Sequence, residues 1–369
     1  MQILGIDLGF GFTKATDGKR SLIVKSVIGE AVEDRLGGPM SDARPGSDHL
    51  HLELEDRGVF AGDLAERKSS LRSFTLDQDR FIAESAKVLA LAVASDLAEP
   101  DRPIGVVTGL PISSYRAKAD ELTRELRGRH VLTTIAPDGG RTRQVLEISE
   151  VKVIPQPFGS VYDMVLNEAG AVGDRHTLQQ KIGIVDVGFQ TSDLTVSDRG
   201  TFLERASQST ETGVGRAFAT IAGKIREKSG VSVELYRLYD AMEEGRITIR
   251  GESFDLSKLI EHVMNQLASD IAADANRLWA DEWDMDAIAI TGGGGAVLAP
   301  YLTPLLDGRV LPMDGARDAR LNNVRGFHKL GVQTWGAASA AAPPAPEPEQ
   351  EPVLVGGNGH QERHPASPY

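Results

Sequence analysis

The sequence contains no cysteine, and this absence excludes several classes of protein at once. A disulfide scaffold, a zinc–thiolate site, an iron–sulfur cluster and a cysteine nucleophile all require that residue. Long hydrophobic runs are also missing: the best, residues 88–94, is far shorter than the roughly 20 apolar residues that span a bilayer. The chain opens directly into MQILGIDLG, without the charged region and cleavage site of a secretory signal. We therefore expect a cytoplasmic protein with no transmembrane segment.

Positive charge is in short supply, with 40 lysine and arginine residues against 53 aspartates and glutamates. The net charge of −13 argues against a protein that binds nucleic acid directly over its whole surface. The remaining composition, 41% hydrophobic and 25% charged among 369 residues, is typical of a globular protein with two or three domains. Glycine, in contrast, is abundant: the 39 residues are about half as many again as an average composition gives.

The chain divides into a folded body and a tail. Residues 339–369 are rich in proline and glutamate and bury too little apolar surface to offset the entropy of ordering, so we predict a disordered tail. In the body, short β-branched runs alternate with helical patterns, which predicts an α/β fold with parallel or mixed sheets. We expect strands at Ile3–Asp7, Thr13–Ala15, Leu22–Val27, Ile104–Thr108, Val145–Val153, Lys181–Asp186, Asp193–Val196 and Ala287–Thr291, and helices at Asp79–Leu97, Ser114–Leu126, Gly159–Asn167, Gly215–Ser229, Val233–Glu244, Asp255–Leu278 and Val324–Ala338.

An internal repeat relates the two halves of the body. The segment Gly5–Asp17 resembles Ile184–Val196: in each copy an apolar strand ends in aspartate, a glycine turn follows and a second strand returns. Asp7 aligns with Asp186, and the copies lie about half of the body apart. The repeat predicts two domains of related fold that face each other across a cleft.

Each hairpin carries groups that bind phosphate. Gly9 and Gly11 allow backbone N–H groups of the turn to approach an anion closely, and Lys14 adds a positive charge. An aspartate at the strand end repels phosphate, but a hydrated Mg²⁺ between them resolves the repulsion, so Asp7 and Asp186 are predicted to hold magnesium through water. A single glycine turn is more often an ordinary β-hairpin. Two copies with matched aspartates favour a nucleotide site.

A third glycine-rich segment follows the expected strand Ala287–Thr291. Four consecutive glycines, Gly292, Gly293, Gly294 and Gly295, separate this strand from a helical pattern and permit close approach to a planar or phosphate-bearing ligand. The segment lacks the G-x-G-x-x-G spacing of a dinucleotide site, and the sequence contains no G-x-x-x-x-G-K-S/T motif. A Rossmann dehydrogenase and a P-loop NTPase are therefore disfavoured. We interpret the glycine excess as partly concentrated where backbone must approach a nucleotide, in residues 5–11, 183–188, 213–215 and 292–295.

The order of hairpin, second hairpin and glycine-rich strand end is similar to that of the superfamily of actins, heat-shock chaperone ATPases and sugar kinases. Within it, the chain resembles the ParM/StbA-type actins of bacteria and archaea in Val107–Tyr115, Pro155–Gly159 and Asn323–Phe327. The resemblance extends over the body, from residue 3 to about 335. It implies a two-domain actin-like ATPase fold, in which duplicated ribonuclease H-like domains flank a nucleotide cleft.

The resemblance also implies domain boundaries. Residues 1–158 are expected to form domain I, with an inserted subdomain at about 28–75 that is polar and rich in glycine. Residues 159–325 are expected to form domain II. Residues 326–338 would then form a C-terminal helix that returns to domain I, ahead of the tail.

By the same resemblance, the expected ligands are ATP and Mg²⁺. The phosphates would be held by Gly9, Phe10, Gly11, Phe12, Thr13 and Lys14 in the first hairpin and by Gly188, Phe189, Gln190 and Thr191 in the second. Phe10 and Phe189 stand where eukaryotic actin has polar residues, so backbone N–H groups must make more of the contact. The adenosine would be contacted by Gly213, Gly215, Lys224, Glu227, Lys228 and the four glycines after Thr291. A solvated helix face explains the three charged residues of that set almost as well.

Two further residues are implied for catalysis. Gln156 falls where actins place the residue that orients the attacking water, and Asp193 falls where ParM-like proteins place an aspartate that assists it. Gln156 is neutral and can only position the water, so Asp193 is the expected proton acceptor. Structural alternatives stay open: Asp193 could cap a turn or pair with a cation, and Gln156 could be an ordinary polar helix start.

The resemblance implies an ATPase that assembles into a homopolymeric, cytomotive filament and moves plasmid or other DNA through a DNA-binding adaptor protein. An actin-like scaffold that positions an organelle or the cell is an alternative within the same fold. A small-molecule kinase would share the hairpins but would need a substrate pocket and a catalytic base, for which we find no motif. A heat-shock-type chaperone would need a β-rich substrate domain where this sequence has a proline-rich tail.

Overall fold

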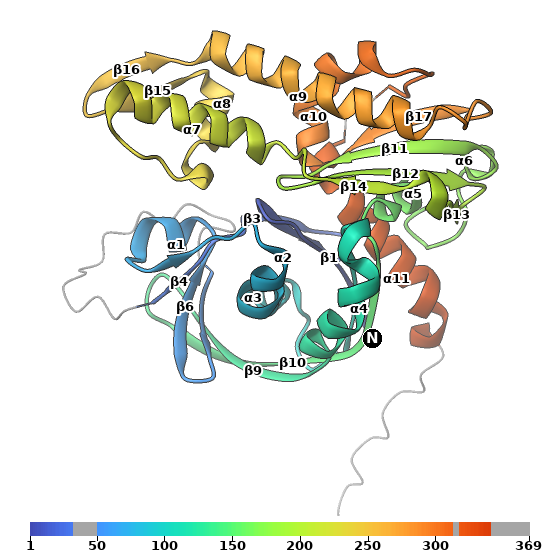
Figure 1. The fold of residues 1–369 in the computed structure, drawn as a ribbon. Helices are drawn as coiled ribbons and strands as arrows, with labels where there is room; N and C mark the ends of the chain where they lie inside the picture. Colours follow the sequence, from blue (N-terminus) through green and yellow to red (C-terminus); the bar gives the residue numbers. More distant parts are fainter. Residues whose placement is uncertain (32–49, 313–316, 341–369) are drawn as a thin grey trace, which may run out of the picture.

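The computed structural model describes residues 1–31, 50–312 and 317–340. These residues form two domains that each contain strands and helices, so the predicted α/β class is confirmed; domain I is the lower and domain II the upper in Figure 1. The predicted tail, 339–369, lies almost entirely outside the described residues. Within them, no helix combines the length and the apolarity needed to cross a membrane.

The strands follow the chain in two groups. Domain I contains β1 Gln2–Leu8, β2 Phe12–Thr16, β3 Ser21–Lys25, β4 Ile28–Glu30, β5 His51–Leu54, β6 Arg57–Ala61, β7 Arg72–Ser73, β8 Ile104–Leu110, β9 Gly128–Ile135 and β10 Arg141–Pro155. Domain II contains β11 Lys181–Val187, β12 Ser192–Asp198, β13 Thr201–Phe202, β14 Gln208–Thr210, β15 Arg246–Ile249, β16 Glu252–Asp255 and β17 Ala287–Thr291.

The helices lie between and beside these strands. The α-helices are α1 Asp63–Lys68, α2 Gln78–Arg80, α3 Lys87–Leu97, α4 Ile112–Leu126, α5 Phe158–Val165, α6 Arg175–Leu178, α7 Gly215–Ser229, α8 Tyr239–Glu244, α9 Ser257–Leu278, α10 Gly292–Leu302 and α11 Asn322–Ala340. The π-helical turn η2 covers Phe81–Ala86, and the 3₁₀ turns are η3 Glu204–Ala206, η4 Leu235–Arg237, η5 Thr303–Leu305 and η6 Ala319–Leu321.

Domain I is built on a ten-stranded sheet with the order β3-β2-β1-β8-β10-β9-β5-β6-β4-β7. At its centre β1, β8 and β10 run parallel, and β1 and β8 are buried at every residue. Such burial is expected of parallel strands that are covered on both faces. Residues 28–75 include β4 to β7 and α1, and they continue the same sheet where β5 pairs with β9.

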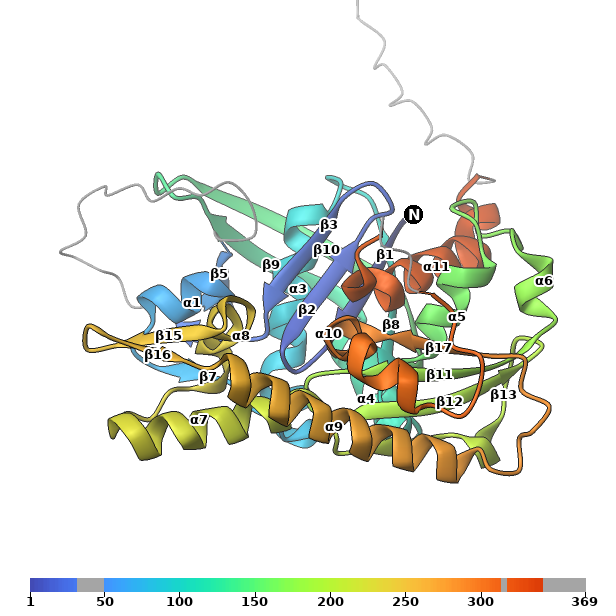
Figure 2. The same ribbon diagram turned by 90° about the horizontal axis from the view of Figure 1, so that it is seen from above.

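Domain II contains a smaller sheet whose central strands are arranged like those of domain I. Its strand order is β13-β12-β11-β17, and β14 pairs with β12. Figure 2, which looks down on this domain, shows α7 and α9 on the side toward the viewer, where the two helices contact each other. In both domains an antiparallel hairpin lies beside a parallel strand: β1–β2 beside β8, and β11–β12 beside β17. The internal repeat of the sequence is thus a repeat of structure. Its register sets Asp7 opposite Lys14, and Asp186 opposite Asp193.

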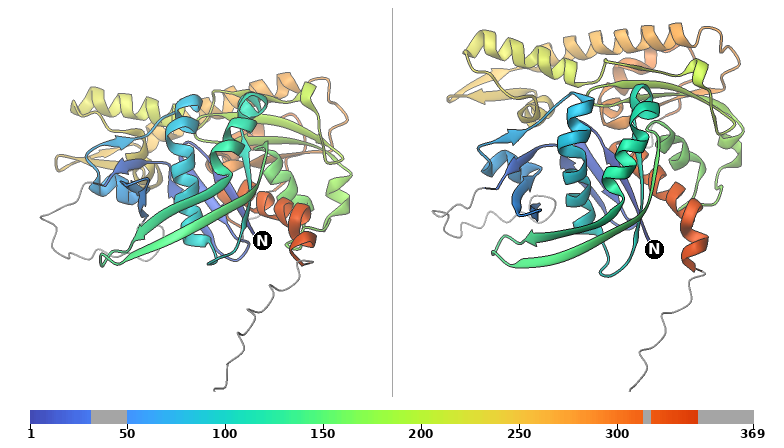
Figure 3. Two further views of the ribbon diagram at one scale, coloured as in Figure 1. Left: turned by 90° about the horizontal axis from the view of Figure 1, so that it is seen from below. Right: turned by 60° about the horizontal axis from the view of Figure 1, so that its bottom comes forward.

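Glycines bring α11 close to its neighbours. This helix, red in Figure 3, packs on the face of the domain I sheet opposite to α3 and also against α5. A Cβ atom on Gly326 would lie 1.7 Å from the carbonyl oxygen of Gly159, so the backbones of α11 and α5 are in contact. A Cβ atom on Gly5 of β1 would lie 2.3 Å from the carbonyl oxygen of Val324. Only residues without a side chain allow α11 to pack this tightly on both elements.

Several elements differ from the sequence expectations. The expected helix 79–97 contains the π-helical turn η2, and the expected helix 233–244 is divided into η4 and α8. The four glycines after Thr291 form the first turn of α10, where we expected them to precede the helix. The short strands β4 to β7 and β13 to β16 have two to five residues each, which is too few for an alternating pattern to reveal them.

Candidate functional site

The first strand ends in a buried carboxylate near the boundary between the domains. Asp7, one residue before the end of β1, has no exposed surface, and its side chain accepts two hydrogen bonds. Lys14 Nζ lies 2.8 Å from Oδ2, and Gln156 Nε2 lies 2.7 Å from Oδ1. Lys14 comes from the facing position of β2, and Gln156 from the junction of β10 and α5. The fold thus brings three of the predicted site residues together.

The repeated hairpin presents a second buried carboxylate. Asp186 is 5% exposed, and its Oδ2 accepts a hydrogen bond of 2.7 Å from Asn323 Nδ2 at the start of α11. Burial raises the pKa of Asp186 to about 6, and the charge of Asp7 adds to this effect while the Asn323 bond opposes it. Gly292 makes room for the side chain: its φ is 82°, and a Cβ atom there would lie 2.3 Å from Asp186 Oδ1.

These two aspartates suit a hard cation. The charge of Asp7 disfavours the ionised form of Asp186, and a cation between them would relieve that repulsion. Carboxylate oxygens are ligands that Mg²⁺ accepts while it keeps several of its waters. Among the residues that the structure describes, no group of three or more ligating side chains is placed to hold a metal ion. Two carboxylates are a donor set that fits a magnesium ion, which binds one or two such groups and keeps the rest of its water shell.

A third buried carboxylate reaches from domain II to domain I. Asp193 lies opposite Asp186 and is 3% exposed. Its Oδ1 accepts hydrogen bonds from Ser209 Oγ and, at 3.3 Å, from the backbone N–H of Ile112, the first residue of α4. The N–H of Ser113 donates to Ser209 Oγ at 3.0 Å. Asp193 therefore caps the first turn of α4, whereas the alternatives from the sequence were a capped turn or a pair with a cation. No described group bonds its Oδ2.

Burial also brings the pKa of Asp193 close to neutral pH. Removal from water raises the pKa of Asp193 from 3.8 to about 7. The hydrogen bond from Ser209 lowers the pKa, and the charge of Asp186 raises it further. Near neutral pH, a substantial fraction of the molecules therefore carries the carboxylate form. A base is most effective when its pKa lies close to the working pH.

The turns of the two hairpins carry unpaired backbone N–H groups. Within the described ranges, no acceptor is found for the N–H groups of Phe10, Gly11, Phe189 and Gln190. Successive unpaired N–H groups in a glycine-containing turn form an anion-binding concavity. The second turn is closed by a 2.9 Å hydrogen bond from the N–H of Gly188 to the carbonyl oxygen of Thr191.

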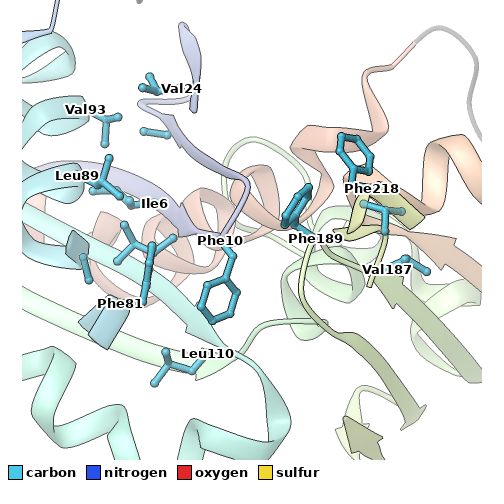
Figure 4. Packing of buried hydrophobic residues seen from close by; sticks show 14 of the residues in the cluster. Ile6, Phe10, Val24, Phe81, Leu89, Val93, Leu110, Val187, Phe189 and Phe218 are labelled. Carbon is cyan, nitrogen blue, oxygen red and sulfur yellow. The ribbon is translucent and has the colours of Figure 1, made fainter. Parts of the chain in front are cut away.

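The phenylalanines of the turns pack into the domains. The ring centroid of Phe10 lies 5.1 Å from that of Phe81 in domain I, and that of Phe189 lies 5.3 Å from that of Phe218 in domain II. Figure 4 shows Phe10 on the side of Phe81 and Leu110, and Phe189 beside Phe218. Any contact that Phe10 and Phe189 make with phosphate must therefore come from their backbone, as the sequence predicts.

Other residues of the first hairpin shape its turn. The hydroxyl of Thr13 pairs with Ser26 Oγ at 2.9 Å, and Ser26 Oγ donates to the carbonyl oxygen of Gly9 at 2.6 Å. Thr13 is fully buried, so its side chain supports the turn from within domain I. Phe12 makes an aromatic contact with Tyr239 of domain II, with ring centroids 4.5 Å apart.

The turn before α7 is bonded to the second hairpin. The N–H groups of Gly213, Val214 and Gly215 donate to the carbonyl oxygens of Gln190, Gly188 and Phe189, at 3.1, 3.1 and 2.7 Å. A Cβ atom on Gly213 would lie 2.3 Å from the carbonyl oxygen of Phe189, and one on Gly294 would lie 2.6 Å from Val214 Cγ1. Gly213, Gly215 and Gly294, three of the glycines predicted to contact adenosine, thus pack beside the turn of the second hairpin.

The three charged residues predicted to contact adenosine lie on the exposed face of α7. Lys224, Glu227 and Lys228 are exposed, and Lys224 Nζ pairs with Glu227 at 2.8 Å. No described hydrogen bond or ion pair links them to the glycine turns. This is the arrangement of a solvated helix face, and contact of these residues with adenosine stays a prediction.

Residues from later in the chain complete the site, and the sequence gives little signal for them. Asn323 bonds Asp186 from α11, and Ser209 bonds Asp193 from β14. Arg320 lies beside the glycine run, since a Cβ atom on Gly293 would be 3.8 Å from Arg320 Cγ. Asn323 lies in the segment that carries the family resemblance, and that is the one clue to it in the sequence.

Two cavities lie outside this constellation. One of about 240 Å³ is lined by residues that include Met1, Asp17, Glu99, Arg102 and His328. Another of about 160 Å³ is lined by residues that include Asp163, Thr291, Arg317 and Asn322. Neither is lined by the turns of the hairpins.

Two family models match the chain side by side. The model for the N-terminal domain of actin-like proteins matches residues 5–159, and the model for the C-terminal domain of the archaeal, MreB-like actin homologue matches residues 184–303. Together they cover more than half of the chain and include both hairpins and the glycine run. A search of curated proteins finds no match.

Solved structures share the fold over nearly the whole chain. A non-polymerisable quadruple mutant of pCBH ParM is 24% identical, with a TM-score of 0.74, and the match covers 91% of this chain and 99% of that one. ParM from a 15-stranded filament of Clostridium botulinum is 23% identical, with a TM-score of 0.74 and coverages of 90% and 99%. An archaeal actin homologue in complex with ADP is 17% identical, with a TM-score of 0.70 and coverages of 92% and 100%. The predicted fold is thereby confirmed.

Proposed function

Because the chain belongs to the actin-like proteins, we propose that it binds ATP between its two domains and hydrolyses it while assembling into a filament. One observation carries the proposal: two related hairpins bring Asp7, Asp186 and Asp193, together with two turns of unpaired N–H groups, to one interdomain site. A triphosphate presents a row of charged oxygens, so donors that approach it from two sides suit it well.

Different groups of this chain would bind the phosphates and the magnesium ion. The two turns would donate backbone N–H groups to the phosphate oxygens, and Lys14 would add its charge beside Asp7. Asp7 and Asp186 would hold Mg²⁺ through water, and the bound ion would neutralise charge on the phosphates. The buried rings of Phe10 and Phe189 exclude bulk water from the back of each turn.

Gln156 would orient the attacking water, and Asp193 would accept a proton from it. The hydrogen bond from Gln156 Nε2 to Asp7 fixes the orientation of the amide and leaves Oε1 as an acceptor for a water proton. Asp193 Oδ2 has no described partner and could take the proton as the water oxygen attacks the terminal phosphorus and ADP leaves. Because Asp193 also caps α4 of the other domain, a change in its protonation would alter a contact between the domains.

Filament formation by this chain is supported by its fold, which it shares with a protein solved as a ParM filament. We propose further that the filament moves plasmid or other DNA in the cytoplasm. The net charge of −13 favours a separate DNA-binding adaptor over direct contact with DNA. A scaffold role would use the same fold and the same nucleotide site.

Light scattering and negative-stain microscopy with ATP–Mg²⁺, with ADP–Mg²⁺ and without nucleotide test the proposal. Assembly with ATP, at protein concentrations where the other two conditions give none, is the expected result. A protein that binds ATP but does not assemble at any concentration would contradict the filament and favour a small-molecule kinase. Filaments that bind no DNA in the presence of host-cell extract would favour the scaffold.

Replacing Asp7 by asparagine should weaken Mg²⁺-dependent ATP binding about 10- to 100-fold, the range for loss of a group that supports a metal ion. Asparagine keeps the size of the side chain and one acceptor but removes the charge. The measurement is a titration with fluorescent ATP in Mg²⁺ and in EDTA, with Asp96→Asn, an exposed change on α3, as the control. Wild-type affinity in Mg²⁺ would refute the role of Asp7.

A further inference from the structure

A group of aromatic side chains joins the two domains beside the nucleotide site. We call it the aromatic bridge; it consists of Phe12 and Phe74 of domain I and Phe189, Phe218 and Tyr239 of domain II. Its ring centroids are 4.5 Å apart for Phe12 and Tyr239, 6.0 Å for Phe74 and Phe189, 5.7 Å for Phe189 and Tyr239, and 5.2 Å for Phe218 and Tyr239. Tyr239 therefore contacts rings from both domains.

The hydroxyl of Tyr239 ends against the turn of the first hairpin. A Cβ atom on Gly11 would lie 2.7 Å from Tyr239 Oη and 2.9 Å from Phe189 Cγ. Gly11 is one of the residues whose backbone N–H has no acceptor. A hydroxyl from domain II thus lies beside a residue of domain I whose backbone donor is unpaired.

This hydroxyl has no partner of its own. Tyr239 Oη is buried and makes no hydrogen bond with any described residue. Burial also raises the pKa of Tyr239 far above its usual value of 10, so the group stays a neutral donor. Buried polar groups are nearly always hydrogen-bonded, and a hydroxyl left unpaired costs stability. The hydroxyl has a hydrogen to donate, and an acceptor for it would have to lie next to Gly11.

We propose that Tyr239 donates its hydroxyl hydrogen to a phosphate oxygen of the nucleotide bound by the first hairpin. The inference rests on the nucleotide binding proposed above. A phosphate oxygen is a charged acceptor, and the turn beside the hydroxyl already offers N–H groups suited to it. Because Tyr239 belongs to α8 of domain II, the bond would tie that part of domain II to a ligand held by domain I. Binding of the nucleotide would then add a contact that connects the two domains.

A neighbouring tyrosine provides a matched control. Tyr236 is buried, and its ring lies 5.5 Å from that of Phe74, so it packs on the edge of the aromatic bridge. Its hydroxyl, however, donates to the carboxylate of Glu234. The two tyrosines share a segment and a packing environment, but Tyr239 alone of the pair has an unpaired hydroxyl.

The test replaces each tyrosine by phenylalanine, which removes one oxygen and keeps the ring. Tyr239→Phe is expected to lower the affinity for ATP and for ADP about tenfold, as for a lost hydrogen bond to a charged group. Its affinity for adenosine should stay at the wild-type level. Without nucleotide, the midpoint of thermal unfolding of Tyr239→Phe should equal or exceed that of the wild type, because an unpaired buried hydroxyl has been removed. The rise in this midpoint on addition of ATP should be smaller for Tyr239→Phe than for the wild type. Tyr236→Phe should bind all three ligands normally.

The results separate this inference from the function on which it rests. Wild-type ATP affinity in Tyr239→Phe, or an equal loss for adenosine, would overturn the role of the hydroxyl while leaving nucleotide binding intact. A lower unfolding midpoint without nucleotide would also overturn it, because it would reveal a partner within the protein. If the wild-type chain bound no ATP, the proposed function would fail and this inference with it.

Discussion

Replacing Asp193 by asparagine should reduce ATP hydrolysis about 10²- to 10⁴-fold, the usual contribution of a general base, while ATP binding stays close to the wild-type level. Asparagine retains an oxygen that accepts from Ser209 and Ile112, so the cap on α4 survives. It cannot accept a proton from water. Phosphate release at saturating ATP, together with a binding titration, measures the two properties separately. Turnover at the wild-type rate would show that the base is another group.

The pKa of the Asp193 carboxylate determines how we expect hydrolysis to depend on pH. The pKa of Asp193 is raised to about 7, and the ionised form is the one that accepts a proton. The wild-type rate should therefore rise with pH, reach half of its maximum near pH 7 and fall about tenfold for each unit well below it. The residual activity of Asp193→Asn should lack this step. A wild-type profile that is flat between pH 6 and 8, a range of about one unit on each side of that pKa, would contradict the assignment.

Stability should change in the opposite direction to activity. The pKa of Asp193 is higher in the folded protein than its ordinary 3.8, so its contribution to the free energy of unfolding is full below about pH 4 and is lost as the pH rises through about 7. At pH 8, nucleotide-free Asp193→Asn should therefore unfold at a higher temperature than the wild type, and the difference should shrink at pH 5. A variant that is less stable at both pH values would show that the carboxylate is stabilising.

Gly326→Ala should cause the largest loss of stability of any substitution considered. The added Cβ atom would lie 1.7 Å from the carbonyl oxygen of Gly159 and 2.8 Å from the backbone nitrogen of Asp163, and neither atom can rotate away. Overpacking in a well-packed core typically costs about 1–3 kcal/mol, and we expect the upper end or beyond because both obstacles are backbone. Gln156 lies just before α5, so ATP binding should weaken as well. Denaturant unfolding gives the free energy directly.

Gly223→Ala is the matched control for this change. Gly223 lies on the exposed side of α7, and a Cβ atom there would meet nothing within 4 Å. Alanine is the better helix former by about 0.5–1 kcal/mol, so this variant should be more stable than the wild type. Two glycine-to-alanine changes in helices are thus expected to have opposite signs. Equal stability of Gly326→Ala and the wild type would mean that α5 and α11 do not touch through their backbones.

The sequence predicts the central parts of both domains because their signals are local. An apolar strand, an aspartate and a glycine turn follow one another directly in each hairpin, and the repetition of Asp7 as Asp186 reveals the duplication. Burial of β1 and β11 at every residue agrees with the apolar runs at their centres, residues 3–6 and 182–185. Short edge strands such as β13 and β15 escape prediction, because the sheet and not their own composition decides their conformation.

The sequence is less informative where side chains from distant segments meet. Asn323, Ser209 and Tyr239 reach the site from elements that only the fold brings there. The glycine excess also has a second cause beyond the nucleotide turns. A Cβ atom on Gly5 would collide with the carbonyl oxygen of Val324, as described above, so this glycine serves helix packing within the protein. Spacing along the chain cannot distinguish a glycine that faces a ligand from one that faces a neighbouring helix.

Whether hydrolysis at the interdomain site controls assembly is tested most directly by the time course of light scattering after a limited amount of ATP–Mg²⁺ is added to wild-type protein and to Asp193→Asn. Both proteins should assemble, because both bind ATP. The wild-type signal should then decay as the ATP is consumed, while the signal of Asp193→Asn should persist. If the wild-type signal never rises, or if both signals decay at the same rate, then hydrolysis at this interdomain site does not control assembly.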